Sequence, residues 1–256
     1  MICILGAVNQ EIAGIKGRLK IVDRFKLGHA PAWVGILEGK EITLIRTGIG
    51  KGPAAEALTN VLERFSLSLV VSTGYMGAAD PRLKVGDVLV ADQVLELKDS
   101  SGDAFTSKKA AKEYAIHPSL LELTANVFAD GATVFRGGLL TVDRVVAEPK
   151  DKVNAGQFYS VLGIDMETSA LARLAGEKGV PFISVRAVSD TVDQKLVDIS
   201  PFLEADGEVS TLKAGWYVLT HPGKIKNLVS LREHSQRATR SLTQFLGDVL
   251  KQEISV

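Results

Sequence analysis

The stretch Gly163-Ile164-Asp165-Met166-Glu167-Thr168, followed by Val185-Arg186-Ala187-Val188-Ser189-Asp190, carries the strongest structural and chemical signal in this chain. Each half places a carboxylate at the end of a short apolar run, which is typical of a buried strand. Between them, the apolar residues of Met166 to Lys178 recur at helical spacing, so the order strand, helix, strand predicts a sheet flanked by helices. Ligands bind at the carboxyl ends of the strands in such sheets. The two carboxylates are therefore candidates for holding a polar ligand from two sides.

The same alternation of apolar runs and helical patterns extends outward over the 256 residues and predicts one α/β domain, residues 1–256. Residues 98–116 are polar and charged, which indicates a surface loop. Heptad-like apolar spacing predicts a long amphipathic helix near the C-terminus, over about residues 223–252. Strands are expected within 2–8, 32–37, 42–47, 69–73, 85–97, 133–140, 161–164 and 182–188, and helices within 11–19, 54–65, 119–128 and 166–178.

Composition excludes several classes of protein. Thirty basic residues balance thirty acidic ones, so no charge surplus favours nucleic acid or an anionic membrane. No run of eighteen apolar residues and no signal-peptide pattern occurs, and the single cysteine, Cys3, leaves no partner for a disulfide. We expect a cytoplasmic protein. The four histidines share no ligand spacing, so neither a metal site nor a Ser-His-Asp triad is predicted.

Two glycine-rich segments have both a structural and a functional interpretation. Gly48-Ile49-Gly50-Lys51-Gly52 lacks the spacing of a nucleotide-phosphate loop. It is either a tight strand-to-helix turn or a place where backbone amides reach an anion or a sugar hydroxyl. Ser72-Thr73-Gly74-Tyr75-Met76-Gly77-Ala78 follows a buried strand, and its small residues either form a simple turn or let a flat ligand approach the backbone.

The acidic candidates also have simple alternatives. Glu11 read alone fits a solvated helix face. Asp165 and Glu167 fit acids at a helix N-terminus, where the helix dipole would keep Glu167 ionised and able to accept hydrogen bonds from vicinal hydroxyls. Asp190 follows a mostly apolar strand, and desolvation there favours a neutral, proton-donating carboxyl group.

Taken in order, these segments resemble the purine nucleoside phosphorylase and 5′-methylthioadenosine/S-adenosylhomocysteine nucleosidase superfamily. Each motif is weak alone, and five in order with plausible spacing are specific. The resemblance runs from residue 1 to about 190. It rests on Ile4-Leu5-Gly6-Ala7 with Glu11, Thr47-Gly48-Ile49-Gly50-Lys51, Ser72-Thr73-Gly74 through Leu83-Lys84-Val85-Gly86-Asp87, Asp165-Met166-Glu167, and Arg186 to Asp190.

The resemblance implies a three-layer αβα fold around a twisted mixed sheet, assembled as homodimers or larger homo-oligomers, and cleavage of the bond between a ribose carbon and a purine nitrogen. It implies that Asp190 protonates or hydrogen-bonds purine N7, and that Glu167 with the Met166 backbone holds the ribose hydroxyls. No cofactor is implied. Further candidates for substrate binding are Ile49, Tyr75, Met76, Gly77, Val145, Val146, Asp165, Arg186 and Ser189.

Either water or phosphate could attack the sugar. In the resemblance, Glu11 falls where nucleosidases keep the carboxylate that activates water, and that carboxylate would repel an incoming phosphate. No arginine occurs in residues 1–17 or between Asp190 and Arg232, where phosphorylases supply one. We therefore favour hydrolysis of a nucleoside substrate. The alternative is a phosphorylase with phosphate as co-substrate, for which Arg46, Lys51 and Arg186 are the remaining cations.

Departures from the nucleosidase pattern leave the 5′ group of the substrate open. Tyr75 stands where a small residue is usual, Asp165 where Glu is more common, and Val145 where a base-stacking Phe is frequent. Residues 191–222 exceed the usual connection and form either a lid or 5′ pocket, or a subunit contact; they contain Phe202, Trp216 and Tyr217. Relatives that act on futalosine or adenosylhopane are compatible with such a pocket.

Two further alternatives remain. A non-catalytic nucleoside-binding relative would not need Glu11, Glu167 and Asp190 together. A dinucleotide-binding oxidoreductase lacks its fingerprint.

Overall fold

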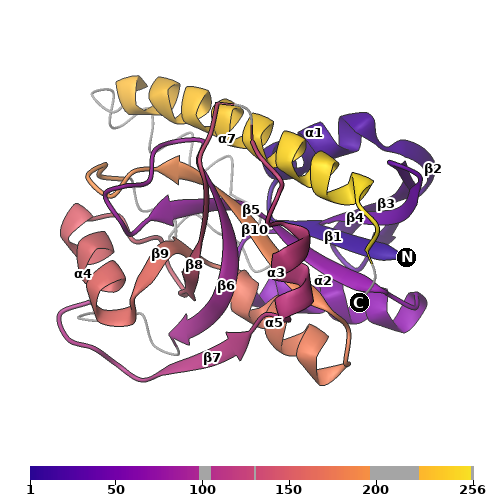
Figure 1. Cartoon of the computed structure of the whole chain (residues 1–256), viewed down its shortest axis with the longest axis horizontal. Coiled ribbons are helices and arrows are strands. Elements are labelled where there is room, and N and C mark those ends of the chain that lie inside the picture. Colours follow the sequence, from indigo (N-terminus) through magenta and orange to yellow (C-terminus); the bar gives the residue numbers. More distant parts are fainter. Residues whose placement is uncertain (98–104, 130, 197–224, 255–256) are drawn as a thin grey trace.

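The computed structural model describes residues 1–97, 105–129, 131–196 and 225–254, with side chains from residue 233 onward in the last segment. A twisted sheet of parallel and antiparallel strands lies between two groups of helices (Figure 1). This arrangement confirms the predicted mixed α/β fold with helices on both faces of the sheet.

The sheet has the strand order β10-β6-β8-β9-β5-β1-β4-β3-β2, and β7 pairs with β6 outside this order. An additional pairing joins β10 to β5, so the pairings among β5, β10, β6, β8 and β9 close a ring. Strand bounds are β1 Ile2–Gly6, β2 Lys20–Leu27, β3 Ala30–Leu37, β4 Lys40–Arg46, β5 Leu69–Ala78, β6 Val88–Leu97, β7 Ala111–Ala115, β8 Val134–Thr141, β9 Val161–Asp165 and β10 Phe182–Asp190.

Strand β5 is the centre of this topology. It pairs in parallel with β1 on one side and with β10 on the other, and its last residues pair with β9. Because β1, β4, β5 and β10 all run in the same direction, their carboxyl ends reach one edge of the sheet. The residues that follow these strands are thereby brought together.

The helices cover the two faces in pairs. Helices α1 and α7 pack on each other and α7 crosses β10, whereas α2 packs on α5 on the opposite side (Figure 1). Helix bounds are α1 Asn9–Arg18, α2 Lys51–Arg64, α3 Pro118–Leu123, α4 Pro149–Tyr159, α5 Thr168–Glu177 and α7 Ile225–Lys251.

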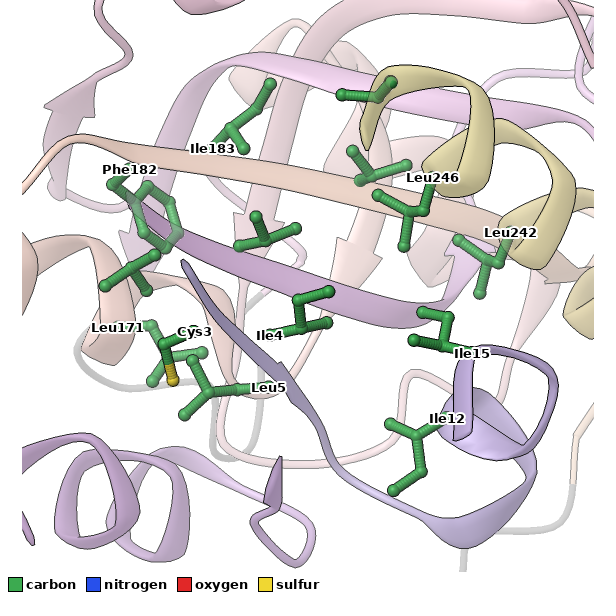
Figure 2. Packing of buried hydrophobic residues seen from close by; sticks show 14 of the residues in the cluster. Cys3, Ile4, Leu5, Ile12, Ile15, Leu171, Phe182, Ile183, Leu242 and Leu246 are labelled. Atoms are coloured by element: carbon green, nitrogen blue, oxygen red, sulfur yellow. The ribbon is translucent and has the colours of Figure 1, made fainter. Parts of the chain in front are cut away.

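Alternation along β1 explains how one strand supplies both faces of the core. Ile4 lies on the side of Ile15 and Leu246, from α1 and α7, while Cys3 and Leu5 lie on the side of Leu171 from α5 (Figure 2). Successive side chains of a strand point to opposite faces, so an unbroken apolar run is required where both faces are covered. This is why the run from Ile2 was readable as a strand.

Three elements differ from the sequence prediction. Residues 111–115 form strand β7 rather than part of a loop, while residues 98–104 lie outside the described residues. Strand β2 and helix α4 were not predicted, because β2 is an edge strand with mostly exposed side chains and α4 has little amphipathic character. The C-terminal helix was predicted, but the segment proposed as a lid or subunit contact lies outside the described residues from residue 197 to 222. No described helix has the length and apolarity needed to cross a membrane.

Replacing Ile4 by Ala should lower the free energy of unfolding by about 2–5 kcal/mol, because it leaves a cavity at a fully buried position between β1 and α7. The measurement is urea unfolding followed by circular dichroism. Val22→Ala, at a side chain 73% exposed on β2, is the control and should change the free energy by less than about 0.5 kcal/mol. Equal effects of the two substitutions would contradict the core assignment.

Candidate active site

A cavity of about 990 Å³ opens at the carboxyl ends of the strands. This volume is at the upper end of the range of small-molecule pockets, about 300–1,000 Å³. The cavity gathers residues from β5, β9 and β10 and from the loops after β1, β4 and β8. Every predicted site residue except Arg186 lines it: Glu11, Ile49, Tyr75, Met76, Gly77, Val145, Val146, Asp165, Met166, Glu167, Ser189 and Asp190.

Glu11 is buried and held by three backbone amides. Its Oε2 accepts hydrogen bonds from the amides of Ala7 at 2.6 Å and Val8 at 3.0 Å, and its Oε1 accepts one from the Tyr75 amide at 2.8 Å. The Val8 contact is a helix-capping bond at the start of α1. Burial nevertheless raises the pKa of Glu11, with Arg186 and the amides acting in the opposite direction. Glu11 is therefore a buried pocket acid and not the solvated helix residue of the simpler interpretation.

Gly74 makes room for this arrangement. A Cβ atom at this position would lie 2.3 Å from Nη1 of Arg186 and 2.6 Å from Oε1 of Glu11. Contacts that short do not occur in real proteins, so any side chain here would displace the acid or the guanidinium. The glycine of the second glycine-rich segment thus serves the close approach of Glu11 to β5.

Glu167 lies between β9 and α5 and is also buried. Its Oε1 accepts a 2.8 Å hydrogen bond from the Gly50 amide at the start of α2. The pKa of Glu167 rises to about 8, chiefly through burial and then through the nearby Asp165 carboxylate. This rise is opposite to the expectation that the helix dipole keeps Glu167 ionised, because burial and a second acid outweigh the dipole. The Gly50 amide, for its part, donates to a side chain of the protein itself and not to an anion or a sugar hydroxyl.

Asp165 and Arg186 pair with each other. Asp165 Oδ2 lies 2.8 Å from Nη2 of Arg186, and each side chain is 1% exposed. Asp165 also accepts hydrogen bonds from Thr141 at 2.7 Å and from the amide of Thr168 at 3.0 Å, which caps α5. Arg186 further donates to Ser72 at 2.8 Å. The main contacts of these two predicted binding residues are therefore with each other and with the strands and helix next to the cavity.

Asp190 ends β10 beside Gly77 of β5. It is 4% exposed, and its Oδ2 lies 2.5 Å from Nζ of Lys152, itself buried. The hydroxyl of Ser189 lies 2.7 Å from the other carboxyl oxygen, Oδ1. Sequence reasoning found Asp190 and missed Lys152, because helix α4 was not predicted and 38 residues separate the two side chains.

Tyr75 and Met76 connect the pocket to its surroundings. The Tyr75 hydroxyl lies 2.6 Å from Thr239 Oγ1 and donates to the Ser235 carbonyl at 3.2 Å, which ties β5 to α7. Burial raises the pKa of this tyrosine to about 12. The thioether of Met76 lies against Gly163 of β9, where a Cβ would come within 2.2 Å of its sulfur.

Further residues line the cavity that were not predicted to bind the nucleoside, although Arg46 was considered as a cation for phosphate. Helices α1 and α7 contribute polar and small side chains, Arg46 ends β4, and Arg144 lies on the loop after β8. Helical spacing could have revealed the α7 residues only as a solvent-facing stripe. The additional lining residues are Val8, Asn9, Gln10, Ala13, Arg46, Val142, Arg144, Lys152, Ile164, Leu196, Ser235, Gln236 and Thr239.

Within the described part of the chain, no group of three or more His, Cys, Asp and Glu side chains is arranged to hold a metal ion. The acids of the pocket instead pair with Arg186, Lys152 and backbone amides. The absence of a cofactor stays a prediction.

Comparison with known proteins gives concordant results. The 5′-methylthioadenosine/S-adenosylhomocysteine nucleosidase of Staphylococcus epidermidis is 33% identical over 208 residues, 78% of this chain and 90% of the relative. The enzyme of the same name from Staphylococcus haemolyticus is 32% identical over 217 residues, 82% of this chain and 94% of the relative.

Solved structures show the same fold. The Neisseria meningitidis 5′-methylthioadenosine/S-adenosylhomocysteine nucleosidase in complex with methylthio-immucillin-A superposes with a TM-score of 0.75 at 24% identity, covering 98% of both chains. Futalosine hydrolase of Helicobacter pylori superposes with a TM-score of 0.74 at 21% identity, covering 97% of this chain and 96% of that one. The family model described as the phosphorylase superfamily matches residues 1–214. With the fold, the relatives and the family model in agreement, the chain belongs to the phosphorylase superfamily.

Proposed function

We propose that this protein is a nucleosidase that hydrolyses the N-glycosidic bond of a purine nucleoside, of adenine type and modified at the 5′ position. The observation that carries the proposal is the meeting of three buried carboxyl groups, those of Glu11, Glu167 and Asp190, at one cavity. They come from three separate segments of the chain. Each has a different set of partners, which allows each a different role.

The roles follow from the chemistry of the bond. The glycosidic bond breaks with positive charge developing on the sugar and negative charge on the leaving base. Asp190 must carry a proton for this step, which it donates to N7 of the departing purine fully or as a hydrogen bond, and Glu167 accepts hydrogen bonds from the ribose hydroxyls. Glu11 takes a proton from the attacking water, and its raised pKa suits a base that works near neutral pH.

The relatives support the substrate class. Those at 30–33% identity are named as nucleosidases of methylthioadenosine and adenosylhomocysteine. A neighbouring structure from Colwellia psychrerythraea contains adenine. A 6-aminopurine as the leaving base is consistent with both. Val145, at the position where a stacking aromatic residue is frequent, gives a narrower apolar contact to that base.

The cations of the site favour water over phosphate as the attacking group. Arg186 is committed to Asp165, Ser72 and Thr168 and does not line the cavity. Lys51 pairs with Glu96 at 3.0 Å and with Asp143 at 2.8 Å. The arginines that do line the cavity are Arg46 and Arg144, and an oxyanion there would also meet the carboxyl groups of Glu11 and Glu167. Phosphorolysis is the alternative that this arrangement makes less favourable.

The 5′ group is assigned to the side of the cavity where α1 and α7 meet. Asn9 and Gln10 from α1 and Gln236 and Thr239 from α7 line this side. From the sequence, residues 191–222 are either a lid or pocket for the 5′ group or a subunit contact, and residues 197–222 lie outside the described residues. A 5′ substituent larger than a methylthio group, as in futalosine or adenosylhopane, is compatible with a cavity of about 990 Å³.

The first prediction of this function is hydrolysis without phosphate. The purified protein should release free base and free sugar from 5′-substituted adenosines in phosphate-free buffer, because Glu11 activates water. The measurement is chromatographic identification of the base and sugar from a nucleoside panel with and without phosphate. Glu11→Gln should lower kcat by about 10²–10⁴-fold, whereas Glu63→Gln, at an exposed acid of α2, should leave it unchanged.

Strict dependence on phosphate with ribose 1-phosphate as product would instead establish a phosphorylase. Tight binding of a nucleoside with no turnover would establish the non-catalytic relative.

Nucleoside affinity should depend on pH through Glu167. Burial raises its pKa to about 8, so at neutral pH the carboxyl group must lose a proton before it accepts hydrogen bonds from the ribose hydroxyls. Affinity for a carbocyclic adenosine analogue should therefore rise with pH, by up to about tenfold per pH unit, and level off above pH about 8. Isothermal titration calorimetry measures it. Glu167→Gln should bind more weakly with a smaller pH dependence; a pH-independent wild type would contradict the role.

We also propose that the chain is a single domain over residues 1–256, that it assembles as a homodimer or larger homo-oligomer, and that it acts in the cytoplasm. The superfamily resemblance supports the assembly, and the lone, buried thiol of Cys3 fits a reducing compartment. Phe128, 77% exposed, is an apolar side chain that a subunit contact would cover. Sedimentation velocity should give at least twice the mass of one chain, and a monomer at micromolar concentration would contradict the assembly. Recovery of the protein in a membrane or secreted fraction would contradict the cytoplasmic location.

A further inference from the structure

Lys152 is the one lysine among the largest fully buried side chains of the described residues, with 1% exposure. It lies in the first turn of α4, after Pro149. Lysine is almost never fully buried unless its charge is paired. The proposed chemistry of base, ribose and water assigns no role to it. Its burial therefore needs a reason within the site.

The contacts of the ammonium group supply that reason. Nζ donates to Asp190 Oδ2 at 2.5 Å, to the Thr191 carbonyl at 3.0 Å and to the Gln194 carbonyl at 2.9 Å. A lysine ammonium has three N–H donors, so all three are used. All three acceptors belong to the end of β10 and the segment directly after it.

The carboxyl group of Asp190 is consequently fixed at both oxygens. Lys152 contacts Oδ2, and the Ser189 hydroxyl lies 2.7 Å from Oδ1. Across the strand pair, Gly77 leaves the space that the carboxyl occupies, since a Cβ there would lie 3.0 Å from Oδ2. Rotation of the carboxyl would break a buried, charge-assisted hydrogen bond.

The same region is joined to the start of α4 by further bonds. The Leu196 amide donates to the Ala147 carbonyl at 3.0 Å, and Lys195 pairs with Glu148 at 2.6 Å. Leu196 and Val146 line the cavity on this side. Lys152 is the buried centre of this junction, so it orders the wall of the cavity next to Asp190 as well as Asp190 itself.

We propose that Lys152 is the positioning residue of the leaving-group acid: its ammonium holds the Asp190 carboxyl in the orientation that serves the departing base. This inference rests on the proposed function, in which Asp190 acts on purine N7. All three N–H donors of Lys152 are used within the protein, so the role that we assign to it acts through Asp190. Because this role concerns the chemical step, replacing Lys152 should lower kcat more than it changes KM.

A double-mutant cycle tests the proposal. Lys152→Met should lower kcat by about 100-fold, the loss typical of a misplaced reacting group, while KM changes by less than about threefold. Asp190→Asn should lower kcat by about 10²–10⁴-fold. If Lys152 acts only through Asp190, the double variant should have the kcat of Asp190→Asn within about threefold. Lys150→Met, at an exposed position in the same helix, is the matched control and should behave as wild type.

Each outcome has a defined meaning. Unchanged kcat in Lys152→Met, or losses that multiply in the double variant, would overturn the positioning role. If Lys152→Met fails to fold because the Asp190 charge is left unpaired, the double variant removes both charges and is expected to fold. Its comparison with Asp190→Asn then decides, because a further loss of kcat would overturn the proposal.

Failure of the proposed function gives a different pattern. A wild-type protein without turnover would refute the nucleosidase, and an Asp190→Asn variant with wild-type kcat would refute the role of Asp190. A large loss in Asp190→Asn with none in Lys152→Met would refute the Lys152 inference alone. Lys152→Arg keeps the charge in a different shape and should recover part of the kcat lost in Lys152→Met.

Discussion

The buried guanidinium of Arg186 is the interaction on which the rest of the site depends. It lies on β10, pairs with Asp165 at the end of β9 and donates to Ser72 of β5 and to Thr168 at the start of α5. A planar guanidinium has five N–H donors in a fixed arrangement, against three on a lysine ammonium, and so serves more acceptors at once. One side chain therefore fixes the relative positions of three strands and a helix directly behind the cavity.

Arg186 also makes the accumulation of acids tolerable. Four carboxyl groups, those of Glu11, Asp165, Glu167 and Asp190, line one cavity. Burial raises the pKa of Glu11 and Glu167, and the positive charge of Arg186 acts against that rise at both. Without a buried cation, acids this close would repel each other or take up protons. The second buried cation, Lys152, stands at the far end of the group beside Asp190.

The different partners of the acids explain how similar groups acquire different chemistry. Glu11 is held by neutral amides, Glu167 by one amide beside another acid, and Asp190 by an ammonium. The environment of a carboxyl sets whether it accepts or gives a proton at neutral pH. Asp165 has both a structural and a site position: it lines the cavity, but its oxygens accept from Arg186, Thr141 and Thr168.

Much of the fold was readable because buried strands leave a strong pattern. The runs that became β1, β5 and β10 are apolar on both faces, since helices cover both sides of the sheet there. Strands β2 and β7 lack that signal: β2 mixes charged and apolar residues without regular alternation and most of its side chains are exposed, and β7 is similarly exposed. Helix α4 was missed because its buried face is carried by only a few residues, one of them the charged Lys152.

The sequence by itself determined most of the buried strands along the chain, the acids that follow them and the superfamily to which the chain belongs. Those acids occupy fixed places relative to strand ends, and parallel strands bring such places to one edge. Only the tertiary structure decided which acid pairs with Arg186, which with Lys152, and that burial raises the pKa of Glu167. The physical reason is that pairing and protonation depend on burial and on charges distant in sequence. Gly50 and Glu167 are 117 residues apart, so no local pattern can record their contact.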